Sequence, residues 1–291
     1  MSGDGALEEF DEHRPLLLGL AYRVLGSMWD AEDVVQDAYL RWVRDDRSQV
    51  REPRAYLMTV VSRLALDQLR SARAVRETYP GEWLPEPAAS SELGPMDTAE
   101  LRDTVAYATL HMMERLSPPE RTVFVLREAF GLPYDEITGV VGASNAACRQ
   151  LYHRAAVRLS GGKSRFRPSE RDHDRLLHTF LGAAQSGDLD RLMSLMSEEV
   201  SAWNDGGGRV RAALHPVRGR AKVATFISGL VQRYGTGEVR YVQANGGAAA
   251  WTALDGRDQL VTIAVNEGVI TDIYAVLNPH KLERLLAATT W

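Results

Sequence analysis

The segment from residue 116 to residue 159 constrains the fold of this chain most, because it has the pattern of a helix-turn-helix. Ser117, followed by two prolines and with Glu120 three residues after it, predicts a capped helix start. A second short helix is predicted over residues 133–141 and should end at Gly142, after which Ser144 can cap a third helix. Three short helices joined by tight turns are therefore expected here.

The third of these helices has an apolar and a polar face. Four residues recur at helical spacing and should face inward: Cys148, Leu151, Ala155 and Leu159. The outward residues are Ser144 and Asn145 at its start, then Arg149, Gln150, His153 and Arg154. Residues 144–168 hold six Lys or Arg and no Asp or Glu. Two interpretations of this face remain: a basic surface that is simply solvated, or a helix that enters a DNA major groove and is held there by phosphates. The caps and the turn favour the second interpretation.

Two further segments precede this one, DVVQDAYLRW at residues 33–42 and PRAYLMTVVSRLALDQLRS at residues 53–71. Together with the helix-turn-helix they resemble the extracytoplasmic-function (ECF) sigma factors, small bacterial sigma subunits that keep only regions two and four. The resemblance covers residues from about 8 to 160, with the motifs in the family's order and spacing. It implies that the partners are core RNA polymerase, through its β′ and β subunits, and promoter DNA.

The bulk composition is compatible with this interpretation. The 291 residues, 45% of them hydrophobic and 25% charged, are enough for two or three globular domains. A net charge of −5 does not exclude DNA binding, because the local distribution of charge decides it. One cysteine, Cys148, excludes an internal disulfide or a multi-cysteine zinc site and is expected in the core. No apolar run approaches the ~18 residues of a membrane span, and no signal-peptide pattern is present, so we expect a cytoplasmic protein without cofactor or metal.

Changes in composition predict a multidomain protein. The resemblance implies two all-α sigma domains, a region 2 helical bundle over residues 8–76 and a region 4 helix-turn-helix over residues 100–160. Residues 77–99 and 161–169, rich in Pro, Gly and Ser, read as linkers. Residues 170–291 form the last domain.

The pattern of this last domain is helices first and alternating strands afterwards. Helices are predicted over residues 171–186, 188–198 and 220–234, strands over 200–204, 238–244, 248–254, 259–266 and 269–276, and a closing helix from Pro279. This order predicts an α+β cone with a curved antiparallel sheet. It resembles the SnoaL-like domains.

The polar face of residues 33–42 is the candidate polymerase contact. It carries Asp33, Gln36, Asp37, Leu40 and Arg41. Acidic groups around an exposed leucine suit a helix-on-helix interface, although an ordinary solvated helix face is the alternative. In the family, similar segments contact the clamp helices of the polymerase β′ subunit.

A basic row lies on the next helix, beside an aromatic residue. Its members are Arg54, Tyr56, Arg63, Arg70, Arg73 and Arg76. Basic side chains of this kind can follow the backbone of a single strand. The preceding loop, residues 45–53, matches the place where these sigma factors capture a flipped base of the −10 element.

The cone could also hold an enzyme site. Its candidate acids, bases and hydrogen-bond donors are Asp205, His215, Tyr241, Asp272 and Tyr274. Nothing in the sequence brings two of them together, so packing or capping roles are the default and no catalysis is expected. A one-component repressor with the cone as a ligand sensor is a second alternative, although such a protein would not need residues 33–42.

Three short strings resemble features of one ECF subgroup with a SnoaL-like extension. They are WLPEP at 83–87, DGGGR at 205–209 and NPHKL at 278–282. DGGGR lacks the spacing of a phosphate-binding loop and is expected to be a tight turn. The subgroup usually has NPDKL, so His280 puts in doubt any role that needs a carboxylate there. The candidate regulatory contacts are Trp83, Leu84, Pro85, Asp205, Gly206, Gly207, Gly208, Asn278, Pro279 and Leu282. We expect Trp83 and Leu84 to dock near the other two strings, so that the C-terminal domain acts as an anti-sigma within the chain.

Overall fold

The computed structural model describes residues 3–44, 50–94, 98–160, 170–235 and 237–288. These residues form two compact units. The first contains the described residues up to 77 and those of 90–162, and the second contains residues 78–89 and the described residues from 163 on. Most of the segment predicted as a linker, residues 78–89, therefore packs as part of the second unit.

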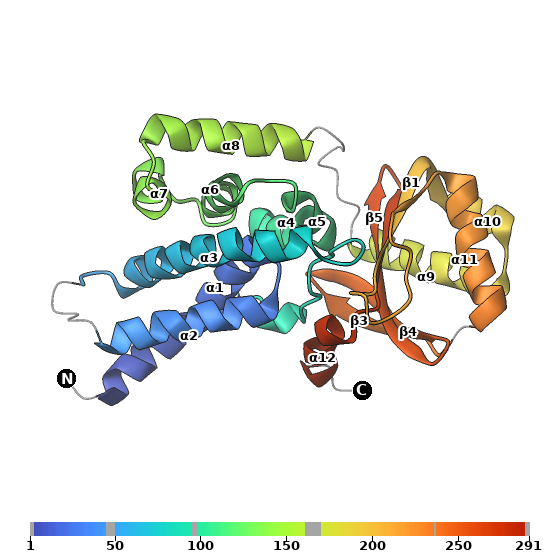
Figure 1. Ribbon diagram of the computed structural model, residues 1–291, viewed down its shortest axis with the longest axis horizontal. Helices are drawn as coiled ribbons and strands as arrows, with labels where there is room; N and C mark the ends of the chain where they lie inside the picture. The colour runs from blue at the N-terminus through green and yellow to red at the C-terminus, as the bar shows by residue number, and fades with distance from the viewer. Residues whose placement is uncertain (1–2, 45–49, 95–97, 161–169, 236, 289–291) are drawn as a thin grey trace. The chain divides into compact units, whose positions relative to one another are not determined.

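Three long helices begin the first unit, α1 (Gly3–Leu25), α2 (Met28–Arg44) and α3 (Pro53–Glu77), and they pack along one another (Figure 1). Each of the three helices buries one apolar stripe in the bundle. The buried residues include Leu17, Leu20, Val24 and Leu25 on α1, Val34, Val35, Ala38 and Trp42 on α2, and Leu57 and Val61 on α3.

The rest of the first unit is made of short helices. They are η1 (Ser90–Glu92), α4 (Ala99–Val105), α5 (Tyr107–Met113), α6 (Pro118–Glu128), α7 (Tyr134–Val141) and α8 (Asn145–Ser160). Helices α6, α7 and α8 pack on one another as the predicted helix-turn-helix. Their caps are as expected: the Ser117 amide donates to Glu120 at 3.0 Å, and Gly142 ends α7 at a left-handed φ of 69°.

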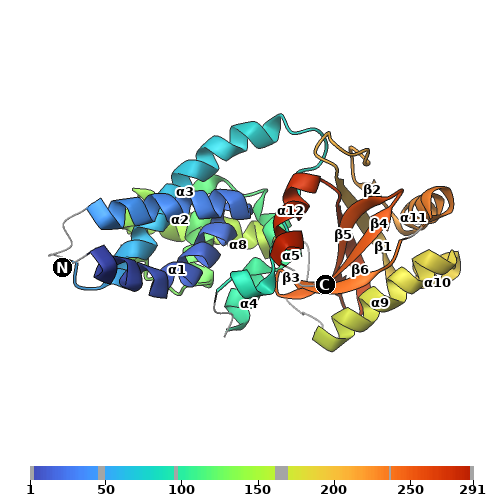
Figure 2. The ribbon, with the colours of Figure 1, turned by 90° about the horizontal axis from the view of Figure 1, so that it is seen from below.

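The second unit is an α+β domain. Its elements are α9 (Glu170–Ser186), α10 (Leu189–Leu195), β1 (Met196–Asp205), β2 (Val217–Arg218), α11 (Arg220–Tyr234), β3 (Arg240–Ala244), β4 (Gly247–Leu254), β5 (Arg257–Asn266), β6 (Val269–Val276) and α12 (Pro279–Ala288). The six strands form one sheet in the order β2-β1-β6-β5-β4-β3. Helices α9, α10 and α11 cover one side of the sheet, and α12 packs against β5 on the other (Figure 2).

Two details of this sheet differ from the prediction. The sheet is mixed, because β1 pairs with the last strand, β6, in parallel, and no hairpin fixes the direction of that pairing. The predicted helix over residues 188–198 was also too long, because α10 ends at Leu195 and β1 begins at Met196. The predicted fold class, helical domains followed by an α+β domain, is confirmed.

Candidate functional site

The face of α2 that was predicted to contact the polymerase is exposed. Asp33, Gln36, Asp37, Leu40 and Arg41 all point away from the bundle, and Leu40 keeps 39% of its surface exposed. The sequence analysis missed Val43, which is 46% exposed one turn after Leu40 and enlarges the apolar part of this face. The opposite side of α2 is fixed by Trp42, whose Nε1 donates to the Ala6 carbonyl at 3.1 Å.

The basic row of α3 is divided by its contacts. Arg54 is exposed and Tyr56 is half-buried, with its ring 5.8 Å from that of Trp42. Arg70 pairs with Asp67 at 3.0 Å, and Arg73 with Glu77 at 3.7 Å. The loop predicted to capture a flipped base lies partly outside the described residues, because 45–49 are not among them.

Arg63 and Arg76 have partners elsewhere in the first unit. Arg63 donates from Nε at 3.0 Å and Nη2 at 2.8 Å to the carbonyl of Gly139 on α7. Arg76 is turned inward, donating to Glu114 at 2.5 Å and to the Leu25 carbonyl at 2.6 Å. It therefore does not belong to the exposed basic row in which the sequence analysis placed it.

A buried charged network joins α1 and α3 to α5 and α6. Glu114 accepts from both Arg76 and Arg121, and Arg121 Nε also donates to the Arg23 carbonyl at 3.2 Å. Arg23 in turn donates to Thr104 Oγ1 at 3.1 Å. Burial alone would raise the pKa of Glu114, but the two arginines lower it below its ordinary value. This carboxyl group is therefore ionised, and it is paired on both sides.

Helix α8 presents the predicted DNA-facing residues Arg149, Gln150, His153 and Arg154 to solvent. At its start, Ser144 Oγ accepts from the Ala147 amide at 3.3 Å, and Asn145 Nδ2 donates to Asp135 at 2.5 Å. Arg154 Nε donates to the buried Glu120 at 3.0 Å, so one side of its guanidinium is held by the protein.

In the second unit, residues 78–89 dock around the buried carboxylate of Asp205, at the end of β1. Tyr79 donates its hydroxyl to Asp205 Oδ1 at 2.7 Å, and the Leu84 amide donates to Oδ2 at 3.0 Å. Burial and the neighbouring Asp205 carboxylate raise the pKa of Tyr79, so this hydroxyl keeps its proton and remains a donor. Leu84 is fully buried and Pro85 is buried, whereas Trp83 is half-buried.

Lys281 completes this cluster, and the sequence analysis missed it. Its Nζ lies 2.7 Å from Asp205 Oδ2, donates to the Leu84 carbonyl, and sits 4.0 Å from the centre of the Trp83 ring. Lys281 is only 6% exposed, next to the buried Leu282. A lysine beside the apolar stripe of a short amphipathic helix was the available signal, because such a lysine needs a buried acidic partner.

The glycines after Asp205 let the docked segment approach closely. DGGGR forms the predicted tight turn, with the amides of Arg209 and Val210 both bonded to the Gly206 carbonyl at 3.0 Å. A Cβ on Gly207 would lie 2.3 Å from Asn278 Nδ2 and 2.8 Å from the Tyr79 hydroxyl, and one on Gly208 would lie 3.0 Å from Pro80. The turn is therefore shaped by its contact with residues 78–89.

The remaining contacts of the docked segment are with the sheet edge and with NPHKL. The Ala88 amide donates to Asn245 Oδ1 at 3.2 Å, and the Asn245 amide donates to the Ala88 carbonyl at 2.9 Å. Asn278 Nδ2 donates to the Tyr79 hydroxyl at 2.8 Å. Pro279 and His280 are exposed, so the position where the subgroup usually has a carboxylate faces away from this cluster.

The structure does not assemble the candidate catalytic residues into one site. Asp205 is engaged by the docked segment, and Asp272 accepts from Trp203 Nε1 at 3.1 Å. Tyr274 is buried, His215 is exposed, and Tyr241 is 42% exposed with its ring stacked on His178. The helices of the described residues are all too short or too polar to cross a membrane.

Comparisons with known proteins identify the family. Residues 10–75 match Sigma-70 region 2, and residues 107–159 match Sigma-70 region 4. The ECF RNA polymerase sigma factor SigJ of Mycobacterium tuberculosis is 38% identical over 289 residues, which cover 94% of this chain and 92% of that protein. The chain belongs to the ECF sigma factors.

Other similarities to ECF sigma factors extend over the full length. The probable ECF RNA polymerase sigma factor SigI of M. tuberculosis is 33% identical over 298 residues, 94% of each chain. The crystal structure of M. tuberculosis SigJ superposes with a TM-score of 0.78 at 35% identity, covering 96% of this chain and 98% of that one. An ECF sigma factor works with core RNA polymerase and promoter DNA, and this chain directs promoter-specific initiation of transcription.

Proposed function

We propose that the exposed face of α2 is the surface by which this sigma factor docks on the β′ subunit of core polymerase. The observation that carries the proposal is the pairing of two exposed apolar residues, Leu40 and Val43, with Asp33, Asp37 and Arg41 around them. An apolar centre supplies affinity when water is excluded from it, and charges at its rim fix the register of two helices. Binding to the polymerase places the protein in the cytoplasm.

We further propose that α3 engages the −10 element and α8 the −35 element. The exposed basic side chains of both helices support this assignment, since phosphate contacts supply most of the affinity for DNA. In this proposal Gln150 reads a base edge, while Arg154, already held by Glu120, contacts a phosphate.

The packing of α3 on α7 would have to open during this process. The centres of the two promoter elements lie about 25 base pairs apart, or roughly 85 Å along the DNA. A compact unit of this size has a diameter of only about 40 Å. The first unit is therefore a closed form, and polymerase binding separates its two halves at the Arg63–Gly139 contact and at the network around Glu114.

The C-terminal domain, in this proposal, is a built-in regulator and not an enzyme. It binds residues 78–89, which connect the two halves of the sigma core, through Asp205, Lys281 and the glycine turn. While this segment is docked it is not free to extend, so the two halves cannot reach both promoter elements. Release of the segment would then accompany engagement of the polymerase.

The polymerase-binding face is tested by reversing its charges. Arg41→Glu and Asp37→Arg should each weaken binding to core polymerase and reduce run-off transcription, with the fold intact because both sites are exposed. Arg171→Glu, the same change at an exposed position of α9, is the matched control and should bind as wild type does. If all three variants bind core polymerase equally well, the interface lies elsewhere.

A further inference from the structure

Glu120, in the first turn of α6, has a buried carboxylate that two helices of the helix-turn-helix share. The residue is only 3% exposed. On the side of α6, the carboxylate accepts from the Ser117 amide at 3.0 Å and from Ser117 Oγ at 2.8 Å. On the side of α8, it accepts from Arg154 Nε at 3.0 Å and from Arg158 Nη1 at 2.5 Å. One carboxylate therefore holds two arginines of α8 that lie about one helical turn apart.

The charge of Glu120 keeps these two arginines together. Burial alone would raise the pKa of Glu120, but hydrogen bonds from Ser117 and Arg154 and the charge of Arg158 lower it below its ordinary value. The carboxyl group is therefore ionised. Two like charges about one turn apart on a helix repel each other. An ionised carboxylate between Arg154 and Arg158 offsets this repulsion, so both guanidinium groups can stay close to each other.

Both arginines can still bind a further partner. A guanidinium group has several N–H donors, and the hydrogen bonds to Glu120 use one donor of each arginine. More than half of each side chain is exposed, 53% for Arg154 and 51% for Arg158. Gln150, Arg154 and Arg158 recur at about one helical turn and lie on one exposed stripe of α8. Arg158, which the sequence analysis did not include, lengthens the predicted DNA-facing stripe by about 6 Å.

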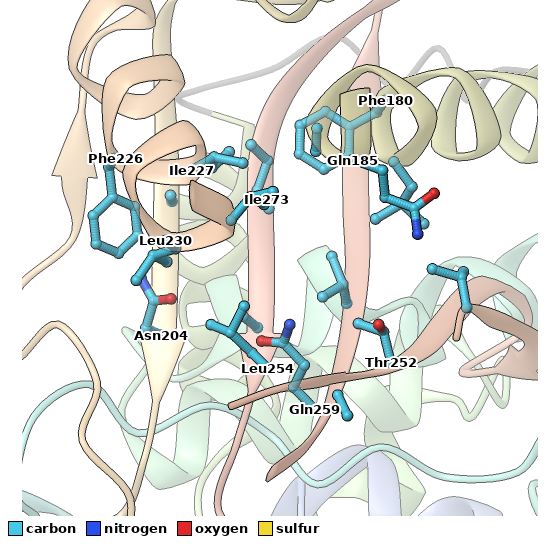
Figure 3. A pocket seen from close by; sticks show the side chains of 18 of the residues that line it. Phe180, Gln185, Asn204, Phe226, Ile227, Leu230, Thr252, Leu254, Gln259 and Ile273 are labelled. Atoms are coloured by element: carbon cyan, nitrogen blue, oxygen red, sulfur yellow. The ribbon is translucent and has the colours of Figure 1, made fainter. Parts of the chain in front are cut away.

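The interior of the second unit does not provide such a site for an anion. Its cavity of about 100 Å³ lies between α9, α11 and the sheet, and its wall includes Phe180, Phe226 and Ile273 (Figure 3). None of the described residues that line this cavity is a Lys, Arg or His. A charged group would lose its hydration there without gaining a counter-charge. An anionic partner is therefore expected at exposed arginines, such as Arg154 and Arg158.

We propose that Arg154 and Arg158 together bind the phosphate backbone of the −35 element, and that Glu120 is the positioning residue that arranges them for it. The proposal rests on the proposed function of α8 and adds Arg158 and Glu120 to it. A planar guanidinium matches the geometry of a phosphate, and such a contact does not depend on the base sequence. An arginine that is already held loses less side-chain freedom on binding, which increases affinity roughly 2- to 10-fold per side chain.

The positioning role is tested by the direction in which Glu120→Gln changes DNA affinity. The full-length variant is titrated with a duplex that carries the −35 element, and binding is measured by fluorescence anisotropy. Loss of a negative charge beside DNA would by itself tighten binding, because phosphates repel that charge. We expect the opposite, binding that is about 2- to 10-fold weaker, because both arginines lose their support. Binding of Glu120→Gln as tight as that of wild type, or tighter, would overturn the proposal.

Two control variants separate positioning from stability. Glu128→Gln changes another carboxylate of α6 that bonds to α8, through the Tyr152 hydroxyl at 2.6 Å, and should bind DNA as wild type does. Ser117→Ala weakens the cap of α6 but keeps both arginine pairs, so it should lower the melting temperature and leave the DNA affinity unchanged. If either control weakens DNA binding as much as Glu120→Gln does, Glu120 acts only through the stability of the helix-turn-helix, and its positioning role is wrong.

Arg158→Ala tests the phosphate contact itself, at an exposed position where the fold stays intact even if Glu120→Gln unfolds the helix-turn-helix. It should weaken binding about 10-fold and lower the slope of log affinity against log salt by about one. In a chain that carries Arg154→Ala and Arg158→Ala, Glu120→Gln should no longer weaken binding, because no arginine is left to position. Unchanged affinity of Arg158→Ala would overturn the proposal. If Arg149→Ala also leaves DNA binding unchanged, the proposed function of α8 fails as well; if Arg149→Ala weakens binding, only this inference fails.

Discussion

Replacing Lys281 by Met tests whether the Asp205 cluster holds residues 78–89 in place. The substitution keeps most of the side-chain volume but leaves the fully buried Asp205 carboxylate without its counter-charge, and it removes the donor to the Leu84 carbonyl. Removing one partner of a buried ion pair costs about 3–5 kcal/mol. The domain can avoid that cost by releasing the docked segment, which lets water reach Asp205. Since about 1.4 kcal/mol corresponds to a factor of ten, the equilibrium constant for release of the segment should rise by at least about 100-fold.

The readout is hydrogen exchange at the Leu84 and Ala88 amides, which bond to Asp205 and Asn245 only in the docked form. In Lys281→Met both amides should exchange about 100-fold faster than in wild type, while amides of β5 and β6 keep their protection. Lys222→Met makes the same chemical change at an exposed position of α11 and should leave the exchange as in wild type. Unchanged protection of Leu84 in Lys281→Met would refute the reasoning.

Three further outcomes follow from the contacts of the two units. Gly207→Ala should destabilise the docked form by at least about 1–2 kcal/mol, because Gly207 has a φ of 58° and leaves no room for a Cβ. Gly229→Ala, at an open helical position, is the control and should not destabilise the protein. Urea denaturation of both variants measures the difference. The pKa of Glu114 is lowered in the folded protein, so its ionised carboxylate stabilises the fold at pH values above its unfolded-state pKa of about 4.5. This stabilisation is lost as the pH falls through the lowered pKa. In Glu114→Gln the free energy of unfolding should therefore decline less steeply below about pH 4.5 than in wild type. Gln150→Ala should weaken DNA binding by ~1–3 kcal/mol and relax the preference for one base of the −35 element, whereas Arg154→Ala should weaken binding to all sequences alike. Gel-shift titrations against single-base promoter variants measure both effects. A change of base preference in Arg154→Ala but not in Gln150→Ala would mean that the two roles are exchanged.

Local signals in the sequence were sufficient for most of the fold. The capping box at Ser117 and the left-handed Gly142 placed two helix ends of the helix-turn-helix correctly, because caps depend on residues close in the chain. The parallel pairing of β1 with β6 joins residues 71 or more positions apart in sequence, such as Ser201 and Asp272, and no local pattern specifies it. The early start of β1 at Met196 was missed because amphipathic periodicity continues across the end of α10.

The functional residues likewise divide into those set by local helical periodicity, which could be predicted, and those set by distant partners, which could not. The exposed faces of α2 and α8 could be predicted because helical periodicity alone separates Asp33 and Arg149 from the buried stripes. The inward turn of Arg76 could not be predicted, because its partner Glu114 follows the end of α5, 38 residues later in the chain. Lys281 was missed for the same reason: its role is defined by Asp205, 76 residues earlier in the chain. Trp83 and Leu84 were both expected to dock; Leu84 is fully buried, whereas Trp83 is half-buried.

The central claim, that this sigma factor is held closed until core polymerase opens it, is tested most directly by a distance between its two DNA-binding halves. One fluorescent label on α2 and one on α8, in a chain whose single cysteine, Cys148, is replaced by Ala, report that distance by single-molecule energy transfer. We predict one population with a distance of at most about 40 Å in the free protein and an increase to roughly 85 Å in the complex with core polymerase and promoter DNA. A free protein already at the longer distance, or a complex that keeps the shorter one, would contradict the account.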